Sequence, residues 1–328
     1  IGGITMIFGI SARIGKSNSP FVIEADEYDT SFFDKRSKFL HYPADYVVLN
    51  NLEFDHADIF GDLDAIKTQF HHWIRTLDQN TVIYSNRKSN ALDDVLSFGV
   101  WSKVKRFNDK LQLRLDWSQK NGGNSFQVFN GKNSLGFVDS PIYGEHNASN
   151  FLASCGIASE FGVSFNNIAN YFNEFKGVKR RLELIKNISD IKIYDDFAHH
   201  PTAIKKTIEA LRNTTRKKVS TAKSNRLIVV FEPRSNTLKL GHDKHRLAES
   251  FKAADVIHVY DGSVNWDVKS AFSDLGRKVY VESKVQKILQ RLSSQVCIGD
   301  TILFMSNGDF QGILQAFVEM LDSKQVHQ

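Results

Sequence analysis

The sequence predicts an α/β protein in which strands alternate with helices, organised as two successive domains. Beyond residue 177, five short apolar runs alternate with amphipathic helical patterns, which is typical of a doubly wound parallel sheet. At roughly 150 residues per domain, the length favours two domains. Hydrophobic residues make up 41% and charged residues 24% of the 328 residues, a composition of globular rather than disordered or collagen-like proteins.

The first half of the chain contains both strand-like and helical patterns. Residues 4–8, 21–24 and 46–50 are β-branched or aromatic runs, and the last two end in polar residues, as buried parallel strands do where they deliver functional groups. Residues 62–77 carry apolar side chains at three- and four-residue spacing, which predicts an amphipathic helix. Residues 98–140 show short alternating runs broken by Asn-Gly pairs, which predicts an antiparallel meander.

Two further helices are expected near residues 146–161 and 165–175, and Phe175–Val178 is the expected hinge. We therefore expect a first domain over residues 1–176, with a parallel sheet plus a small antiparallel sheet, and a Rossmann-like domain over residues 177–328. The expected strands and helices of the second domain lie at residues 191–195, 226–231, 255–260, 278–282 and 301–305, and at residues 201–213, 243–254, 283–293 and 309–321.

Composition disfavours several classes of protein. No apolar run approaches the roughly 20 residues that a membrane span needs. Two cysteines, Cys155 and Cys297, cannot form a disulfide framework or a zinc cluster, so a reducing cytoplasm is the expected compartment. The net charge of +5 includes a basic run at residues 212–226. Because no aromatic residues interleave with that run, a solvated loop is favoured over a nucleic-acid-binding segment.

Two polar clusters follow expected strands in the first half. Glu24–Asp29 places four carboxylates in six residues, and these repel one another unless cations lie among them. Because magnesium binds through one or two carboxylates together with phosphate oxygens, a metal–phosphate site is predicted, with an exposed acidic turn as the alternative. The second cluster is residues 50–58. Since parallel strands deliver their carboxyl ends to one crevice, Glu24 and His56 are expected to approach each other.

Two more clusters lie beside expected helix starts. Asn147 and Asn150 are three residues apart, so they share one helix face, and their amides suit the edge of a purine, whereas capping would explain only one of them. In the second domain, Lys179–Arg181 offers guanidinium groups that match phosphate. Residues 195–202 then place two aspartates at a strand end, followed by paired histidines and by Pro201, which suits a first helical turn.

A glycine-rich segment, Gly9–Ser17, is similar to a phosphate-binding loop but has five residues between its glycines, where that loop has four. Pro20 and an expected strand follow it instead of a helix. We therefore do not expect it to be a true phosphate loop.

Seven motifs, taken together and in order, resemble those of the Mur ligase family: EADEYD, NNLEFDHADIF, GEHNASN, KRRLEL, YDDFAHHPTAI, FEPRSNTLKLG and MSNGDFQGI. The resemblance covers nearly all of the chain. It implies a three-domain enzyme whose N-terminal domain holds a UDP-sugar, whose central domain binds ATP and whose C-terminal Rossmann-like domain brings the amine substrate. Against that pattern, the sequence is expected to begin downstream of the N-terminal domain and of the central phosphate loop. Residues 1–176 would then be the remainder of the ATP-binding domain, and the chain alone would be inactive.

Within the family, EADEYD followed by FFDKRSKF, together with EPRSNT, favours the branch that joins UDP-N-acetylmuramate to L-Ala-γ-D-Glu-meso-diaminopimelate in peptidoglycan recycling. The resemblance implies ATP and magnesium, an acyl-phosphate intermediate, a cytoplasmic location, and neither nucleic acid nor membrane as a partner. A ligase that adds L-alanine, or another family member, is the alternative. A non-catalytic nucleotide- or nucleic-acid-binding module is the alternative of another class.

The resemblance also implies roles for residues of the first domain. Glu24 and His56 resemble the family's magnesium ligands, and Asn147 and Asn150 resemble its nucleotide-contacting asparagines.

In the second domain, Arg181 and Asp196 resemble the pair that closes over ATP. His199 lies beside them and would contact phosphate or order the loop. The candidates for the peptide substrate are polar residues at two strand ends: Arg234, Ser235, Asn236, Ser306 and Asn307.

Overall fold

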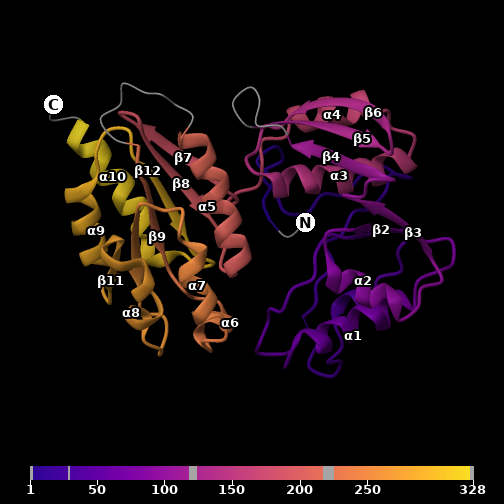
Figure 1. Cartoon of the computed structure of the whole chain (residues 1–328), viewed down its shortest axis with the longest axis horizontal. Helices are drawn as coiled ribbons and strands as arrows, with labels where there is room; N and C mark the ends of the chain where they lie inside the picture. Colours follow the sequence, from indigo (N-terminus) through magenta and orange to yellow (C-terminus); the bar gives the residue numbers. More distant parts are fainter. Residues whose placement is uncertain (1–2, 29, 118–123, 217–224, 326–328) are drawn as a thin grey trace. The chain divides into compact units, whose positions relative to one another are not determined.

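The computed structural model describes residues 3–28, 30–117, 124–216 and 225–325 (Figure 1). The chain divides into two compact units, Ile1–Gly177 and Val178–Gln328, and each is built around one six-stranded sheet. Within the described ranges no helix is long and apolar enough to cross a membrane. The middle of the basic run, residues 217–224, lies outside the described residues.

The sheet of the first unit has the strand order β1-β2-β3-β4-β5-β6. Its strands are β1 (Tyr46–Leu49), β2 (Val82–Asn86), β3 (Lys103–Phe107), β4 (Leu113–Trp117), β5 (Ser125–Asn130) and β6 (Asn133–Asp139). The strands pair in parallel from β1 to β4 and antiparallel from β4 to β6. The antiparallel meander is therefore confirmed over its last three strands. The prediction was wrong for β3, which is partly exposed over four of its five residues and pairs in parallel with β2.

Helices cover both faces of this sheet. The helices of the first unit are η1 (Lys38–His41), α1 (Leu63–Ile74), α2 (Asn90–Ser97), α3 (Glu145–Glu160) and α4 (Phe165–Asn173). The side chain of Asp62 caps α1 by accepting from the backbone N of Ala65 at 2.8 Å, which satisfies one of the free donors of the first turn. One core packs α1 and α2 against Val47 and Ile83, and the other packs α3 and α4 against Tyr84.

Two expected strands of the first unit, residues 4–8 and 21–24, do not form. A strand persists only where a neighbour supplies partners for its backbone groups, and no described strand pairs with either segment. The side chains of Phe21 and Val22 are 76% and 77% exposed. An apolar run was thus insufficient evidence for a strand.

The sheet of the second unit has the strand order β11-β10-β9-β12-β8-β7. Its strands are β7 (Glu183–Ile188), β8 (Ile191–Asp196), β9 (Leu227–Phe231), β10 (Val256–Tyr260), β11 (Val279–Glu282) and β12 (Thr301–Met305). All pairs are parallel except β7 with β8. The five expected strands are confirmed. The sequence analysis missed β7, which is half-exposed and joins β8 through a tight turn at Ser189 and Asp190, both with positive φ.

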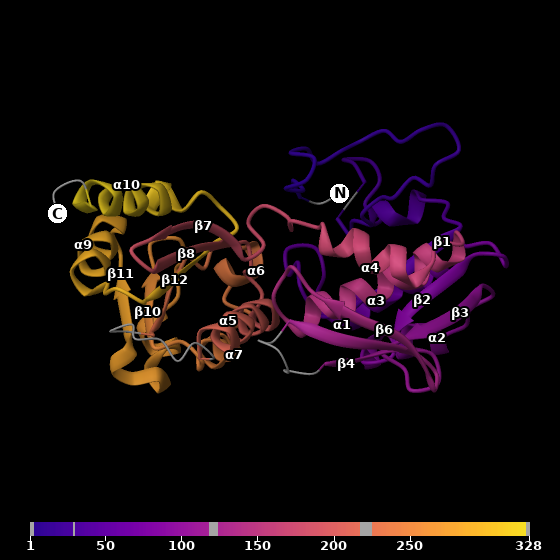
Figure 2. The same ribbon diagram turned by 90° about the horizontal axis from the view of Figure 1, so that it is seen from above.

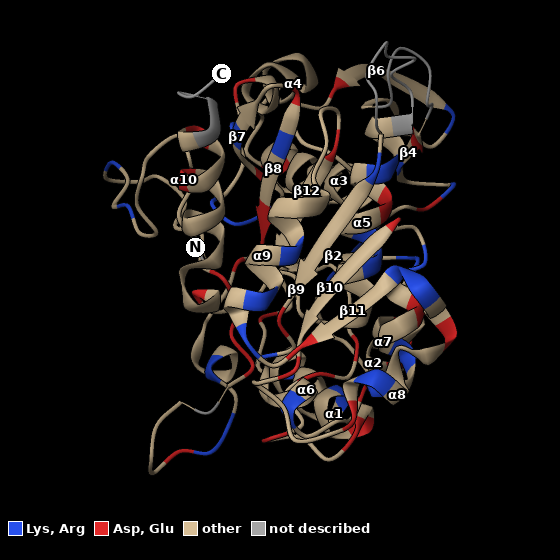
Figure 3. Cartoon of the chain, turned by 90° about the vertical axis from the view of Figure 1, so that its left-hand side faces the viewer, with Lys and Arg blue, Asp and Glu red and all other residues tan. Residues whose placement is uncertain are grey.

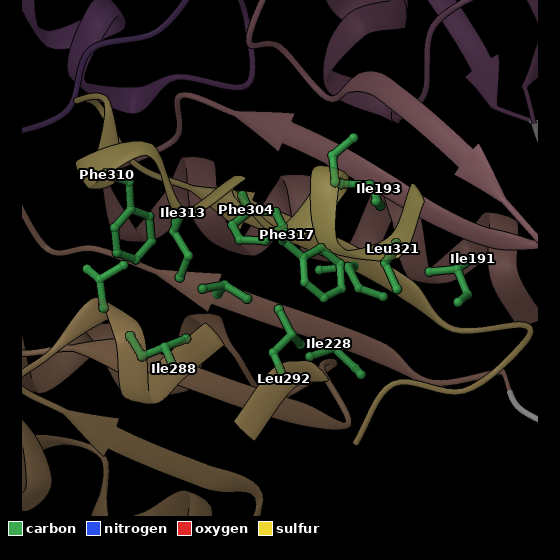
Figure 4. Close-up of a cluster of buried hydrophobic side chains, with 14 of the residues drawn as sticks. Ile191, Ile193, Ile228, Ile288, Leu292, Phe304, Phe310, Ile313, Phe317 and Leu321 are labelled. Carbon is green, nitrogen blue, oxygen red and sulfur yellow. The ribbon is translucent and has the colours of Figure 1, made fainter. Parts of the chain in front are cut away.

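The helices of the second unit are α5 (Pro201–Arg216), α6 (Asn236–Lys239), α7 (Lys244–Ser250), α8 (Val268–Ala271), η3 (Ser273–Lys278), α9 (Val285–Gln295), η4 (Phe310–Gly312) and α10 (Ile313–Gln325). Figure 2 shows α5 and α7 on one face of the sheet and α9 and α10 on the other. On that second face Leu292 and Phe317 pack against Ile228 and Phe304 of the strands (Figure 4). Because the strand order reverses between β9 and β12, a crevice is expected beyond their carboxyl ends.

Charge along these strands is concentrated at their ends. In Figure 3, β9 and β10 carry no charged residue, whereas the arrowhead of β8 is red where Asp195 and Asp196 end the strand. The apolar strands build the core, and the ends that follow them carry the candidate functional groups.

Candidate functional site

The structure brings the first two polar clusters together around His56. The Nε2 atom of His56 contacts Oε1 of Glu27, and its Nδ1 atom lies 2.8 Å from the hydroxyl oxygen of Tyr28. The two rings meet edge to face at 4.4 Å between centroids. The sequence analysis paired His56 with Glu24. In the structure Glu24 is exposed in an irregular segment, and the carboxylate that meets His56 belongs to Glu27, three residues later.

Carboxylates control the charge of this imidazole. Burial acts to lower the pKa of His56, but the hydrogen bond with Glu27 and the charges of Glu27, Asp55 and Asp58 outweigh it, so the pKa is raised. The backbone of His56 is also unusual. Its φ is 55°, a value that is uncommon for a residue other than glycine. An observed backbone outlier of this kind is frequent at functional sites.

The donor set around His56 is compatible with magnesium. Among the described residues, no group of three or more His, Cys, Asp or Glu side chains is arranged to hold a metal ion. Magnesium, however, needs only one or two protein carboxylates when phosphate oxygens and waters supply the other ligands. On the chemistry of their donor atoms, the Glu24 carboxylate, which is exposed, and the His56 imidazole, which Glu27 contacts, are compatible with such an ion.

The third cluster contributes a chain of amides beside the end of β1. Asn50, which follows β1, donates from Nδ2 to Oδ1 of Asn150 at 2.7 Å. Asn150 donates to Oδ1 of Asn147 at 3.4 Å, and Asn147 donates to the carbonyl oxygen of Tyr143 at 2.7 Å. The two asparagines expected on one helix face thus lie together at the start of α3, and Asn50 joins them.

A second amide group, which the sequence analysis missed, lies at the ends of β2 and β3. The Nδ2 atom of Asn108 donates to Oδ1 of Asn86 at 2.9 Å and to the hydroxyl oxygen of Ser149 at 2.8 Å. Asn86 ends β2 and Asn108 directly follows β3. Their position after strands was the available signal, but β2 was not predicted, and residues 103–107 were predicted only as part of an antiparallel meander.

In the second unit, a strained turn presents Arg181. The residues on either side of it, Arg180 and Leu182, have φ values of 59° and 52°. Hydrogen bonds hold the turn: the N of Arg180 donates to Oε2 of Glu183 at 2.8 Å, and the N of Leu182 donates to Oδ2 of Asp196 at 2.7 Å. The Arg181 side chain is exposed and lies over the ring of Phe197 at 5.3 Å. The turn therefore leaves this guanidinium accessible.

Asp196, which ends β8 and holds this turn, is buried, with 4% of its surface exposed. Burial raises its pKa to about 6, because the hydrogen bonds from the N atoms of Ala198 and Leu182 and the charge of Arg181 only partly offset the desolvation of the carboxylate. His199 follows, with Nδ1 3.1 Å from the carbonyl oxygen of Phe197.

The residues predicted to contact the peptide lie beyond β9 and β12. Arg234 and Asn236 are exposed, whereas Ser235 is buried and caps α6 by accepting from the N of Leu238 at 3.3 Å. Ser306 is buried too, and its hydroxyl donates to Oε2 of Glu232 at 2.5 Å. Asn307, the next residue after Ser306, is half-buried.

Glu232 was missed by the sequence analysis, although it is a carboxylate with only 2% of its surface exposed. It directly follows five buried apolar residues of β9. A charged residue in that position was the signal that could have found it.

Two domains known from other proteins match this chain and settle its family. Residues 11–158 match the Mur ligase middle domain, and residues 180–308 match the Mur ligase glutamate ligase domain. The chain belongs to the Mur ligase family. Members of this family with curated names resemble nearly all of it. The UDP-N-acetylmuramate–L-alanyl-γ-D-glutamyl-meso-2,6-diaminoheptandioate ligases of Haemophilus influenzae and Escherichia coli are 38% and 39% identical to it, each over 99% of this chain.

Solved Mur ligase structures agree with this assignment. A murein peptide ligase from Psychrobacter arcticus is 37% identical and superposes with a TM-score of 0.64 over 92% of this chain. A UDP-N-acetylmuramate–alanine ligase from Thermotoga maritima, at 18% identity and a TM-score of 0.67, shares the fold. The chain spans 70% and 69% of the lengths of the two curated relatives and 62% of the Psychrobacter chain.

Proposed function

We propose that this Mur ligase chain serves an ATP-dependent enzyme that joins UDP-N-acetylmuramate to the tripeptide L-Ala-γ-D-Glu-meso-diaminopimelate, in peptidoglycan recycling. The observation that carries the proposal is the 38–39% identity, over 99% of the chain, to two relatives named for that reaction. Polar groups at the carboxyl ends of parallel strands in each unit support it, because such ends bind ligands in open α/β sheets. A cytoplasmic location is part of the proposal and agrees with free cysteines at residues 155 and 297.

The proposed reaction has two steps. A lactyl carboxylate oxygen of UDP-N-acetylmuramate attacks the γ-phosphorus of ATP, so that ADP leaves and an acyl phosphate forms. The amine of the tripeptide then attacks the acyl carbon, and the tetrahedral intermediate expels phosphate and loses the amine proton. Because phosphoryl transfer is mainly positioning and neutralisation of charge, the side chains of this protein are asked to hold the reactants rather than to react.

We assign roles in the first unit on this basis. Asn147 and Asn150 hold the nucleotide base, because each amide nitrogen keeps a hydrogen that an acceptor on the edge of a purine can receive. Glu24 and His56 hold magnesium, with Glu27 as the carboxylate that orients the imidazole of His56. When bound, magnesium neutralises the charge that develops on the phosphate oxygens.

In the second unit we assign Arg181 to the phosphate groups, since its guanidinium is exposed and matches phosphate geometry. Asp196 holds the turn that presents Arg181, through its hydrogen bond from the N of Leu182. His199 contacts phosphate or orders this loop.

The peptide is assigned to the ends of β9 and β12. The residues proposed to face or support it are Arg234, Ser235, Asn236, Ser306 and Asn307.

The choice of amine tests the function. Phosphate release is measured with the natural protein at its full length, ATP, magnesium and UDP-N-acetylmuramate, with either the tripeptide or L-alanine as the amine. We expect release that depends on the tripeptide. Release that depends on L-alanine instead would identify the alternative, an L-alanine ligase, whose curated example from Ligilactobacillus salivarius is 32% identical.

A further inference from the structure

The imidazole of His56 is engaged at both of its ring nitrogens. Its Nε2 atom contacts Oε1 of Glu27, and its Nδ1 atom lies 2.8 Å from the hydroxyl oxygen of Tyr28. The side chain of His56 is 21% exposed, so the ring is held in place without being sealed from solvent. A ring nitrogen binds a metal ion only through a lone pair that no hydrogen occupies. His56 can therefore act in the proposed magnesium site only if one of its two present contacts is exchanged.

The surrounding fold holds Tyr28 independently of His56. The backbone N of Tyr28 donates to Oδ1 of Asp26 at 2.8 Å, and its carbonyl oxygen accepts from the backbone N of Lys38 at 3.0 Å. Lys38 also pairs through Nζ with Oδ2 of Asp26 at 2.8 Å. The ring of Tyr28 then meets the ring of His56 edge to face, with 4.4 Å between the centroids. The position of the hydroxyl group is thus set by its own segment rather than by the imidazole.

A hydroxyl group suits Nδ1 whichever hydrogens the imidazole carries. An ionised carboxylate only accepts, so Nε2 carries a hydrogen while it faces Glu27. Nδ1 then accepts from the hydroxyl of Tyr28 if the ring is neutral and donates to it if the ring is charged. In the neutral ring whose Nε2 has lost its hydrogen, Nδ1 carries one and the oxygen of Tyr28 accepts it. A carbonyl or carboxylate oxygen in the place of this hydroxyl would exclude the neutral ring whose Nε2 donates to Glu27, because such an oxygen only accepts.

We propose that Tyr28 is a positioning residue that keeps Nδ1 of His56 occupied, so that Nε2 is the nitrogen available to magnesium. Glu27 orients the ring in the present structure, and Tyr28 is the partner that remains once Nε2 no longer donates to Glu27. A hydrogen bond at the second ring nitrogen fixes the orientation of a metal-binding histidine in this way. The inference rests on the proposed function, because it takes from it the assignment of His56 to magnesium.

The first measurement observes the imidazole without any metal. Tyr28→Phe keeps the aromatic ring and removes only the hydroxyl group. Nitrogen-15 spectra of the metal-free chain, correlated with the ring hydrogens, report each ring nitrogen of His56 separately. We expect the Nδ1 resonance to shift in Tyr28→Phe, and the Nε2 resonance to show a bound hydrogen with and without the substitution. Tyr171→Phe, which removes the hydroxyl group of a tyrosine that is 68% exposed in the same unit, is the matched control and should leave both resonances unchanged.

The second measurement compares two metal ions as probes of the imidazole. The natural protein at its full length is titrated calorimetrically with Ni²⁺ and with Mg²⁺, and the site of interest is the one that is lost in His56→Ala. Because imidazole suits Ni²⁺ whereas Mg²⁺ prefers oxygen ligands, the ratio of the two dissociation constants reports whether the ring acts as a ligand. A general defect weakens the binding of both ions alike. Tyr28→Phe should weaken Ni²⁺ binding about 10- to 100-fold and Mg²⁺ binding less, and Tyr171→Phe should leave the ratio unchanged.

Either of two results would overturn the inference: an Nδ1 resonance that does not shift in Tyr28→Phe, or a ratio of dissociation constants that Tyr28→Phe leaves unchanged. If His56→Ala removes no binding of either ion, His56 is not a metal ligand and the inference falls with that assignment. The reaction is tested separately. Tripeptide-dependent phosphate release with an unchanged ratio in Tyr28→Phe would leave the function and refute the role of Tyr28, whereas a ratio that depends on Tyr28 without that release would do the reverse.

Discussion

The Asp196→Asn substitution is expected to stabilise the chain above pH 6 and to destabilise it near pH 4. The folded protein holds the pKa of this carboxyl at about 6, chiefly by burial, against an ordinary value of 3.8. Between those two pH values the folded state binds more protons than the unfolded state, so stability falls as the pH rises. The difference of about 2 units corresponds to about 3 kcal/mol of unfolding free energy above pH 6.

Asparagine removes this ionisation but also removes one acceptor. Asp196 accepts from the backbone N of Leu182 at 2.7 Å and from that of Ala198 at 2.8 Å, and an amide retains only one oxygen. The lost hydrogen bond costs about 1 kcal/mol. The variant should therefore be about 2 kcal/mol more stable than the unsubstituted chain at pH 8 and about 1 kcal/mol less stable at pH 4.

Urea denaturation of both chains at intervals from pH 4 to pH 8 measures this difference directly. Asp190→Asn, the same substitution at an exposed aspartate of the same unit, is the matched control. If the difference in unfolding free energy between Asp196→Asn and the unsubstituted chain stays constant across this pH range, burial does not raise the pKa of Asp196, and the reasoning is refuted.

Three other predictions follow from single residues. His258 is fully buried, and burial foremost lowers its pKa to about 4 from 6.5. Stability should thus be lost as the pH falls from 6.5 towards 4, and His258→Phe should recover up to about 3 kcal/mol near pH 4 in the same urea series, with a flat difference contradicting this. Gly156→Ala places a Cβ 2.4 Å from the ring of Tyr84 and should destabilise the chain by about 1–3 kcal/mol, so an unchanged urea midpoint would refute the clash. In the natural protein at its full length, Glu24→Ala should abolish ligation and His56→Ala should weaken it. Glu27→Ala is the comparison that shows which carboxylate serves magnesium. Near-normal turnover of Glu24→Ala at saturating magnesium would remove Glu24 from the site.

The strands of the second unit were predictable because burial on both faces leaves a continuous apolar run. β9 and β12 are buried at every position, and both were found. β7 is half-exposed and carries charged residues, so its sequence lacks that signature. Residues 21–24 show the opposite error, since they have the composition of a strand but no described strand pairs with them.

The candidate site was predictable to the level of clusters but not of contacts. Motifs after strands led to His56 and to the asparagines at the start of α3, because the ends of parallel strands meet at one edge of a sheet. The choice between Glu24 and Glu27 depends on the path of an irregular segment and on the positive φ of His56, which spacing does not encode. Glu232 was overlooked beside Arg234, although its place directly after five apolar residues was a signal, because its contact with Ser306, the residue after β12, cannot be read from spacing.

The amide chain from Asn50 through Asn150 to Asn147 has a single direction. Each side chain donates its N–H to the oxygen of the next, and the last donates to the carbonyl oxygen of Tyr143. A backbone carbonyl only accepts, so it fixes the orientation of Asn147, and the other two amides follow in turn. Each amide nitrogen keeps a second hydrogen, while the oxygens of Asn147 and Asn150 are already engaged. The chain is therefore polarised towards donation, and it should discriminate between two ligands of the same size by whether their facing edge accepts or donates hydrogen bonds.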